Sequence, residues 1–273
     1  MATEPSPSDP LLKRSRPLLG TFVEIAVCAH QPEAHTAIDA AFGEIARLHE
    51  LLSFHSPHSE LSRLNLAGSR GVSPSPLALR VLRLAKLIGQ LSGGRFNCTV
   101  GGRLVRAGIL PDHGFAEFLE TGTPDDVEID GHACRLRRPV LVTLDGIAKG
   151  FAVYRAIRAL KRHGIAAGSV NAGGDLRVFG ELAIPIHLRL PDAPPRFLGF
   201  LKQAAMASST TGHDPGFPGM IVAPGNTSPQ PGPWTVIATS AWRADALTKV
   251  AAACEDHERH ALLARLGGRL IHP

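Results

Sequence analysis

The chain is poor in aromatic residues, with 11 Phe, 2 Trp and 1 Tyr among 273 residues. It also lacks a strong charge of either sign, since 29 Lys and Arg against 24 Asp and Glu leave a net charge of +5. Nucleic-acid binding surfaces need clustered basic side chains, often with interleaved aromatic rings, and neither pattern occurs in the sequence. We therefore expect no nucleic-acid partner. The weakly basic balance is compatible with small anionic ligands.

Cysteine is scarce as well. The four cysteines, Cys28, Cys98, Cys134 and Cys254, are widely separated and form no C-x-x-C pair. This spacing signals neither a zinc knuckle nor a disulfide framework. We expect buried thiols in a reducing compartment.

Long apolar runs are absent too. No run reaches the ~20 residues that a membrane-spanning helix needs, and residues 1–9, rich in Pro, Ser and Thr, lack the apolar core of a secretory signal. We therefore expect a cytoplasmic protein without a membrane span. Because 273 residues exceed the needs of one small core, we predict a disordered tail over 1–14 and a single elaborated domain over 15–273.

The stretch Leu141–Tyr154 is the most informative part of the sequence. Its apolar run is broken by Asp145-Gly146 and then resumes at helical spacing, which predicts a strand, a tight turn and a helix. A helix start leaves backbone N–H groups unpaired and carries partial positive charge, to which Lys149 adds a full charge. The junction would suit an anionic group such as a phosphate. Taken alone, the stretch is better explained as an ordinary strand-to-helix turn with a solvated lysine.

The remaining elements follow from hydrophobic periodicity. Period-two alternation predicts strands at 19–28, 127–142, 168–179, 183–190 and 234–238, the second and third being hairpins. Apolar stripes at spacings of three and four predict helices from Pro32 to Leu52, from Ser75-Pro76 to Gly93-Gly94, and from Ala241 onward. Loops are expected at 53–65, 191–195 and 224–233. Because hairpins flank a helix that lies between two predicted strands, we expect a mixed sheet.

Two polar or glycine-rich segments between these elements suggest a site. The predicted loop 53–65 carries so many hydroxyl, imidazole and carboxylate groups that it is expected to line something, although His55 and His58 judged alone are equally explained as loop histidines. The segment Gly94–Gly102 places small residues around one aromatic, which suits a flat ligand. It has neither the dinucleotide-binding G-x-G-x-x-G spacing nor a P-loop.

Six motifs occur together in a characteristic order. They are Arg16-Pro-Leu-Leu-Gly-Thr21, Ser59-Glu-Leu-Ser-Arg-Leu-Asn65, Gly94-Arg-Phe-Asn-Cys-Thr-Val-Gly101, Gly146-Ile-Ala-Lys-Gly150, Val170-Asn-Ala-Gly-Gly-Asp175 and Ala244-Asp-Ala-Leu247. In this order the chain resembles the FAD:protein FMN transferase (ApbE) family from Arg16 to about Ala253. The resemblance implies an α+β fold of the ApbE type (T-fold-like), with mixed sheets, packed helices and two intergrown subdomains around a flavin-nucleotide cleft.

The resemblance also implies an activity. Family members move FMN from FAD onto a Thr or Ser hydroxyl of an acceptor flavoprotein and release AMP. Such a phosphoryl transfer needs a divalent metal at the pyrophosphate, backbone donors and a positioned hydroxyl. FAD as substrate, Mg²⁺ as cofactor and an acceptor protein as partner are therefore expected.

The resemblance assigns roles residue by residue. Asp245 would be a carboxylate ligand of Mg²⁺ and the carbonyl around Gly146 a second oxygen ligand, in keeping with the preference of Mg²⁺ for hard oxygen donors. Asp245, Lys249 and Lys149 are the implied catalytic residues, with Lys149 beside the FAD phosphates or ribose. The implied nucleotide-binding residues are Leu19, His55, Asn65, Arg95, Phe96, Asn97, Thr143, Lys149, Gly173, Gly174 and Asp175.

The sequence departs from the family pattern at several positions. Lys249 stands where the family commonly has Thr, and a protonated lysine cannot be a metal ligand. The turn 143–146 loses one carboxylate and gains Asp145. The stretch Met220–Pro224 aligns with a His-x-Ile-Asp-Pro motif but has neither the His nor the Asp. Two functions therefore stay open: an active Mg²⁺-dependent transferase, or an FAD-binding protein of the same fold that has lost transfer. The many glycine-rich turns disfavour a protein without a ligand.

Overall fold

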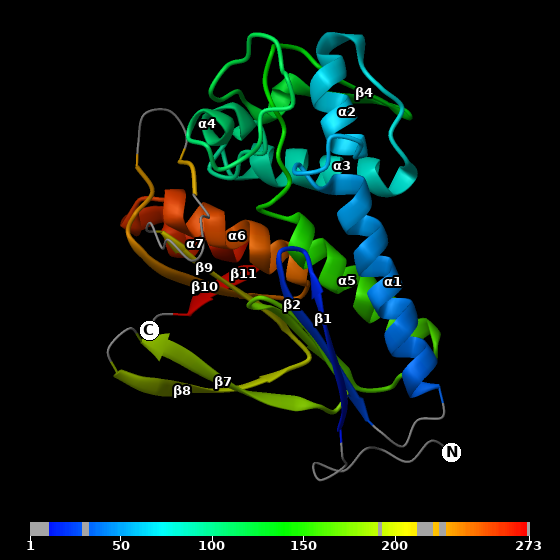
Figure 1. The fold of residues 1–273 in the computed structure, drawn as a ribbon. Coiled ribbons are helices and arrows are strands. Elements are labelled where there is room, and N and C mark those ends of the chain that lie inside the picture. Colours follow the sequence, from blue (N-terminus) through cyan, green and yellow to red (C-terminus); the bar gives the residue numbers. More distant parts are fainter. Residues whose placement is uncertain (1–10, 29–32, 191–192, 212–220, 224–227, 272–273) are drawn as a thin grey trace.

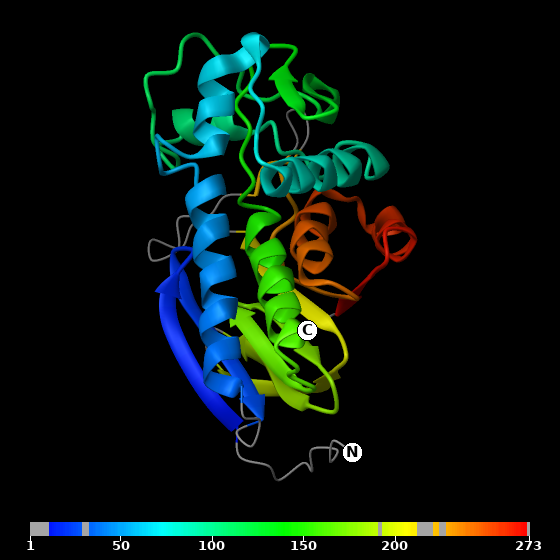
Figure 2. The same ribbon diagram turned by 90° about the vertical axis from the view of Figure 1, so that its right-hand side faces the viewer.

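A computed structural model describes residues 11–28, 33–190, 193–211, 221–223 and 228–271 of the chain. Figure 1 shows two parts: a smaller upper part of helices and loops that includes strand β4 (Ala133–Leu136), and a lower part in which helices pack on a large sheet. The expected α+β class is confirmed. The long helix α1 (Ala34–Leu52) runs along the lower part and reaches the upper one (Figures 1 and 2).

The large sheet has seven strands in the order β1-β2-β5-β6-β9-β10-β11. Their bounds are Leu11–Leu18 (β1), Thr21–Cys28 (β2), Gly168–Ala172 (β5), Asp175–Phe179 (β6), Ala205–Thr211 (β9), Gly232–Ala238 (β10) and Gly268–Ile271 (β11). Every pairing between these strands is antiparallel. The expectation of a mixed sheet is therefore wrong in this detail. It depended on a strand before the central helix, and that segment is not in the sheet.

The segment in question, 141–144, is buried and not part of any ladder. Its backbone is paired elsewhere: the Leu141 carbonyl accepts from Gly101 N at 2.9 Å, and Thr143 N donates to the Cys98 carbonyl at 2.8 Å. Between them, the Asn65 side chain accepts from Val142 N at 2.7 Å and donates to the Val142 carbonyl at 2.9 Å. Buried backbone groups must be paired. Here coil segments and the Asn65 side chain provide the hydrogen-bond partners that a neighbouring strand would otherwise provide.

Three helices cover one face of the large sheet, and α7 (Asp256–Arg265) lies beside them. They are α1, α5 (Ala148–Arg162) and α6 (Ala241–Ala253), of which α1 and α5 lie side by side in Figures 1 and 2. The apolar stripe of α1 is buried as predicted, including Ile38, Phe42 and Ile45. On the other face lies the hairpin of β7 (Ala183–Leu190) and β8 (Ala193–Lys202), against Leu176 and Val178.

The upper part is built from short elements. They are α2 (Glu60–Ala67), the 3₁₀ turns Gly68–Arg70 and Pro124–Asp126, α3 (Pro76–Leu91), α4 (Gly101–Arg106), and the hairpin of β3 (Val127–Asp130) and β4 (Ala133–Leu136). Ser75 caps α3 as predicted, because its Oγ accepts from Ala78 N at 3.3 Å. The predicted hairpin turn at Gly131-His132 is confirmed. Its second strand ends at Leu136 rather than at Val142.

Three further expectations are corrected. Residues 11–14 belong to β1 and pair with β2, so the predicted disordered tail 1–14 is wrong for these residues, while 1–10 lie outside the described part. Within the predicted loop 53–65, Ser59 Oγ accepts from Ser62 N at 3.0 Å and starts helix α2. Strand β8 already begins at Ala193, inside the predicted loop 191–195.

All four cysteines lie in the described part, are buried and form no disulfide. Burial raises the pKa of Cys98 to about 12 and that of Cys134 to about 11. These thiols are therefore packing residues rather than nucleophiles. Across the ranges that the structure describes, no helix is both long and apolar enough to span a membrane.

Candidate functional site

The turns of two hairpins meet at one end of the large sheet. Strands β2 and β5 pair with Val23 opposite Ala172, which brings the turn after β1 next to the turn after β5. The contact is close: a Cβ added to Gly173 would lie 2.6 Å from Thr21 Oγ1. Gly173 and Gly174 both have positive φ, as does Leu19 at φ 57°. The predicted residues Leu19, Gly173 and Gly174 are thus brought together.

The N-terminus of α5 lies over this end of the sheet. Lys149 in its first turn reaches Asp175, the first residue of β6, with 3.5 Å between Lys149 Nζ and Asp175 Oδ2. Burial, reinforced by the charge of Asp245, raises the pKa of Asp175 to about 7. The negative charge of Asp175 in turn raises the pKa of Lys149. Asp175 Oδ2 is buried and accepts no hydrogen bond within the described part of the chain.

Asp245 on α6 caps the N-terminus of α5. Its side chain is fully buried, and its Oδ2 accepts a hydrogen bond from Gly150 N at 3.1 Å. A first-turn donor that the sequence suggested for a phosphate is therefore already paired with a carboxylate of the protein. The two helices approach closely enough that a Cβ on Gly150 would lie 2.6 Å from the carbonyl carbon of Ala241.

Lys249, one turn after Asp245, completes the cluster. Its Nζ donates to Asp245 Oδ1 at 2.5 Å, to the Asp245 carbonyl at 3.2 Å and to Ser209 Oγ at 3.1 Å. Thr248 Oγ1 bonds both Ser209 Oγ at 2.8 Å and the Asp245 carbonyl at 2.7 Å. We name Lys149, Asp175, Asp245 and Lys249 the junction cluster, because they join α5, β6 and α6.

Gly146 and Phe96 lie beside the junction cluster. A Cβ on Gly146 would be 3.1 Å from a ring carbon of Phe96 and 3.6 Å from Cε of Lys249. The turn that ends at Gly146 is held by a hydrogen bond of 2.9 Å from Thr143 Oγ1 to Asp145 Oδ2. The structure therefore brings the predicted residues Phe96 and Gly146 beside Lys249, with Thr143 at the start of the same turn.

The side chains of three other predicted site residues pair with other groups of the protein. Asn65 holds the backbone of Val142, as described above. Arg95 binds Glu258 on α7, with 2.5 Å between Arg95 Nη2 and Glu258 Oε1. Asn97 donates to the Gly122 carbonyl at 2.8 Å and accepts from Thr99 N at 2.9 Å. Their roles at a nucleotide stay predictions, as does that of His55, whose side chain is exposed.

Gly150, Ser209 and Thr248 belong to the site and were missed from the sequence. Gly150 is the last residue of a family motif, but nothing in the neighbouring sequence indicates that α6 passes against this glycine. Ser209 lies in the hydroxyl-rich strand Ala205–Thr211 and meets Thr248 only through the tertiary fold. Of the aligned stretch 220–224, Met220 and Pro224 lie outside the described residues.

The residues present do not fit a Mg²⁺ ion held by the protein. Both oxygens of the Asp245 carboxylate are already paired, Oδ1 with the Lys249 ammonium and Oδ2 with Gly150 N. The described residues contain no group of three His, Cys, Asp or Glu side chains that could hold a metal. An ammonium group at 2.5 Å is also a poor neighbour for a divalent cation.

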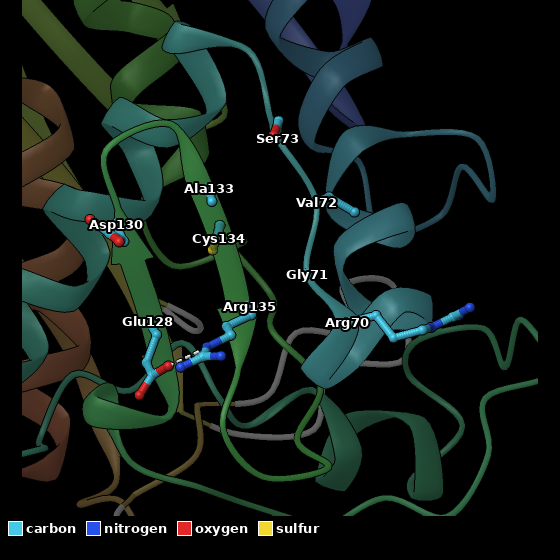
Figure 3. Close-up of a pocket in the computed structure, with 9 residues that line it drawn as sticks. All are labelled: Arg70, Gly71, Val72, Ser73, Glu128, Asp130, Ala133, Cys134 and Arg135. Atoms are coloured by element: carbon cyan, nitrogen blue, oxygen red, sulfur yellow. Dashed lines mark hydrogen bonds and ion pairs between the residues drawn. The ribbon is translucent and has the colours of Figure 1, made fainter.

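A cavity of about 410 Å³ lies elsewhere, between β3–β4 and the segment before α3 (Figure 3). Its walls include the ion pair of Glu128 and Arg135, at 2.5 Å, and the backbone of Val72, which pairs with that of Cys134. None of the predicted site residues lines it. This cavity is separate from the junction cluster.

The buried carboxyl group of Asp175 is expected to make stability depend on pH. Its pKa is about 7 in the folded chain against an ordinary 3.8, so between these values the folded chain holds a proton that the unfolded chain releases. The free energy of unfolding therefore falls as the pH rises through this window. Asp175→Asn should remove roughly 2 kcal/mol of the difference between pH 5 and pH 8, measured by urea unfolding at both values.

The matched control for this prediction is Asp130→Asn, at an exposed position of the β3–β4 hairpin. It is expected to leave the pH dependence of unfolding as in the wild type. An unchanged pH dependence in Asp175→Asn would show that the Asp175 carboxyl stays ionised in the folded chain over the whole range.

Comparison with solved structures defines the class of fold. The chain superposes on the flavin transferase ApbE from Vibrio cholerae with a TM-score of 0.78 and 22% identity, covering 93% of this chain and 90% of that one. It superposes on the ApbE protein from Thermotoga maritima with a TM-score of 0.80 and 22% identity, covering 96% and 93%. At this identity the likeness shows a shared fold.

The family follows from the sequence. Residues 19–270 match the model of the ApbE family, and the chain belongs to that family. Two relatives carry the name FAD:protein FMN transferase: one from Klebsiella pneumoniae, 24% identical over 188 residues, and one from Treponema pallidum, 25% identical over 191 residues. The matches cover 64% and 61% of this chain but only 58% and 51% of those relatives.

Proposed function

We propose that this chain transfers FMN from FAD to a Thr or Ser hydroxyl of an acceptor protein. The proposal is supported by membership of the ApbE family and by the name of the two relatives. The observation that carries it is the junction cluster, in which family motifs from three distant parts of the sequence meet as two carboxylates and two lysines. Such a buried concentration of ionisable groups is typical of functional sites.

The proposed reaction requires cationic groups at the phosphoryl oxygens. The oxygen of the acceptor hydroxyl bonds to the phosphorus of the FMN half, the phosphoanhydride bond to the AMP half breaks, and the hydroxyl proton is released. AMP leaves with the bridging oxygen. Because negative charge spreads over the phosphoryl oxygens, cationic groups must face them. Lys149, at a helix N-terminus with 34% of its side chain exposed, is the proposed group.

Phe96 and the turns at Leu19 and Gly173 are proposed to form the wall for the flavin nucleotide. Phe96 lies in the upper part beside Gly146, and Leu19 and Gly173 lie in the turns that follow β1 and β5. The resemblance implies a dependence on Mg²⁺, but we assign the metal no ligand here because Asp245 is paired with Lys249. The cytoplasm as location also remains a prediction from the sequence.

The second candidate is an FAD-binding protein that has lost transfer. It is favoured by the aligned stretch 220–224, which reads Met-Ile-Val-Ala-Pro and carries no ionisable side chain. Both candidates bind FAD. They differ only in whether the acceptor becomes modified.

A transfer assay separates the candidates. The full chain is mixed with FAD and an acceptor carrying an Asp-Gly-x-Thr-Gly-Ala motif, with MgCl₂ or with EDTA, and the acceptor is followed by intact mass. A flavin-sized mass gain that is absent when the acceptor threonine is replaced by valine is the expected result. FAD binding without any mass gain would establish the second candidate.

FAD is expected to bind at least tenfold more tightly than FMN, a difference of about 1.4 kcal/mol. The reason is that the second phosphate and the adenosine add contacts that FMN lacks. Calorimetric titration with each ligand measures this ratio. Equal affinities would contradict the proposed placement of the pyrophosphate at Lys149, and absence of binding by either ligand would reject both candidate functions.

A further inference from the structure

The side chain of Lys249 lies beside both groups that the family resemblance would make metal ligands. Its Nζ lies 2.5 Å from Asp245 Oδ1, and its Cε would be 3.6 Å from a Cβ on Gly146. The lysine stem therefore packs beside Gly146, and its ammonium group is paired with the carboxylate oxygen that a cation would need.

All hydrogen-bond donors of the Lys249 ammonium group are satisfied. The group can donate three hydrogen bonds, and it has three oxygen acceptors: Asp245 Oδ1, the Asp245 carbonyl and Ser209 Oγ. Thr248 fixes two of these acceptors through its own hydroxyl. A carboxylate, a carbonyl and a hydroxyl oxygen together resemble the oxygen ligands that a hard cation prefers. Here it surrounds a lysine whose side chain is 20% exposed.

The formal charges of the junction cluster agree with this arrangement. Asp175 and Asp245 provide two carboxyl groups, and Lys149 and Lys249 provide two ammonium groups. A threonine at position 249 would leave one positive group against two carboxyl groups, both of which are ionised above the pKa of Asp175, about 7. The chain therefore supplies by itself a positive charge that would otherwise come from a bound cation.

We propose that the Lys249 ammonium takes the place of the divalent metal at Asp245, so that flavin-nucleotide binding by this chain does not require Mg²⁺. The ligand in this inference rests on the proposed function. The positive charge at Asp245 is then fixed to α6 and cannot be removed by chelation.

FAD titrations with and without metal test the inference. In the wild type, the affinity followed by flavin fluorescence should change less than twofold between EDTA and MgCl₂. Lys249→Thr should bind FAD at least tenfold more weakly in EDTA and regain affinity in MgCl₂, because it frees an oxygen of Asp245 and restores a negative balance. Lys249→Arg keeps the charge and should stay independent of metal.

The matched control is Lys202→Thr. Lys202 pairs with Glu181 at the same distance of 2.5 Å, on the exposed β7–β8 hairpin. It is expected to bind FAD as the wild type does, with and without metal. A tenfold or greater gain in wild-type affinity on adding MgCl₂ would overturn the inference.

A second measurement does not depend on FAD. Mn²⁺ alone, followed by electron paramagnetic resonance, should show no wild-type site that Asp245→Asn removes, whereas Lys249→Thr should gain one. A Mn²⁺ site in the wild type that is lost in Asp245→Asn overturns the inference, whatever FAD does. If FAD fails to bind in every condition, the proposed function falls, and the Mn²⁺ measurement still decides the role of Lys249. The wild-type and Lys249→Arg arms remain decisive if circular dichroism shows that Lys249→Thr does not fold.

Discussion

Gly150→Ala is expected to lower the free energy of unfolding by about 3 kcal/mol or to prevent folding. A Cβ at this position would lie 2.6 Å from the carbonyl carbon of Ala241 and 2.7 Å from Cα of Trp242. Both are backbone atoms of α6, so no side-chain rotation relieves the clash, and the two helices must move apart. Their separation would also break the hydrogen bond of 3.1 Å between Gly150 N and Asp245 Oδ2. Urea unfolding followed by circular dichroism measures the loss.

Gly43→Ala is the matched control for this prediction. Gly43 also lies within a helix, α1, but is exposed, and a Cβ there would have no atom within 4 Å. Alanine is the better helix former, so this variant should be stabilised by up to about 1 kcal/mol. If the two variants unfolded at similar urea concentrations, the close approach of α5 and α6 would not exist in solution.

Elements with a local physical cause could be predicted from the sequence. The turn at Gly173-Gly174 needs residues that adopt positive φ, and the structure has a tight β5–β6 hairpin there. Ser75 followed by Pro76 marks the start of α3, because the serine side chain supplies the acceptor that the first turn needs. The stripe of α1 repeats at helical spacing and is buried.

Elements whose partners are remote could not be predicted. Residues 141–144 have the apolar character of a strand, but their backbone pairs with Gly101, Cys98 and the Asn65 side chain, which no local pattern reveals. Strand β1 contains Arg14 and Arg16, and its first four residues look like part of a polar tail. It becomes ordered because it pairs along its length with β2, and because both arginines reach Asp39 on α1.

The same distinction holds for the site. The family motifs pointed to Lys149, Asp175 and Asp245, a departure from the family pattern pointed to Lys249, and the structure brings all four together. The spacing of four residues is sufficient to place Asp245 and Lys249 on one face of a helix. It did not predict that the pair would be buried against α5, nor that Ser209 would join it from β9. Burial is decided by the tertiary fold, and burial is what makes the loss of one partner of a charged pair costly.

The pair of Asp245 and Lys249 is expected to be strongly coupled in stability. Asp245→Asn leaves an ammonium group without its counter-charge, and Lys249→Met leaves a buried carboxylate without one. Each single variant should lower the free energy of unfolding by about 3 kcal/mol. The double variant removes both charges, and should lose about 2 kcal/mol less than the sum of the two. Urea unfolding of the four proteins gives this coupling energy.

The exposed ion pair of Lys202 and Glu181 serves as a reference for the effect of burial on the coupling energy. Its length is the same, 2.5 Å, but 51% of each side chain is exposed, against 20% for Lys249 and none for Asp245. The corresponding cycle with Lys202→Met and Glu181→Gln should give a coupling below about 0.5 kcal/mol, because water screens the charges. Since the two pairs match in length and chemistry, a similar coupling in both cycles would mean that Asp245 is accessible to water. An Asp245 accessible to water would have an oxygen free for a metal ion, and the role assigned to Lys249 would then be untenable.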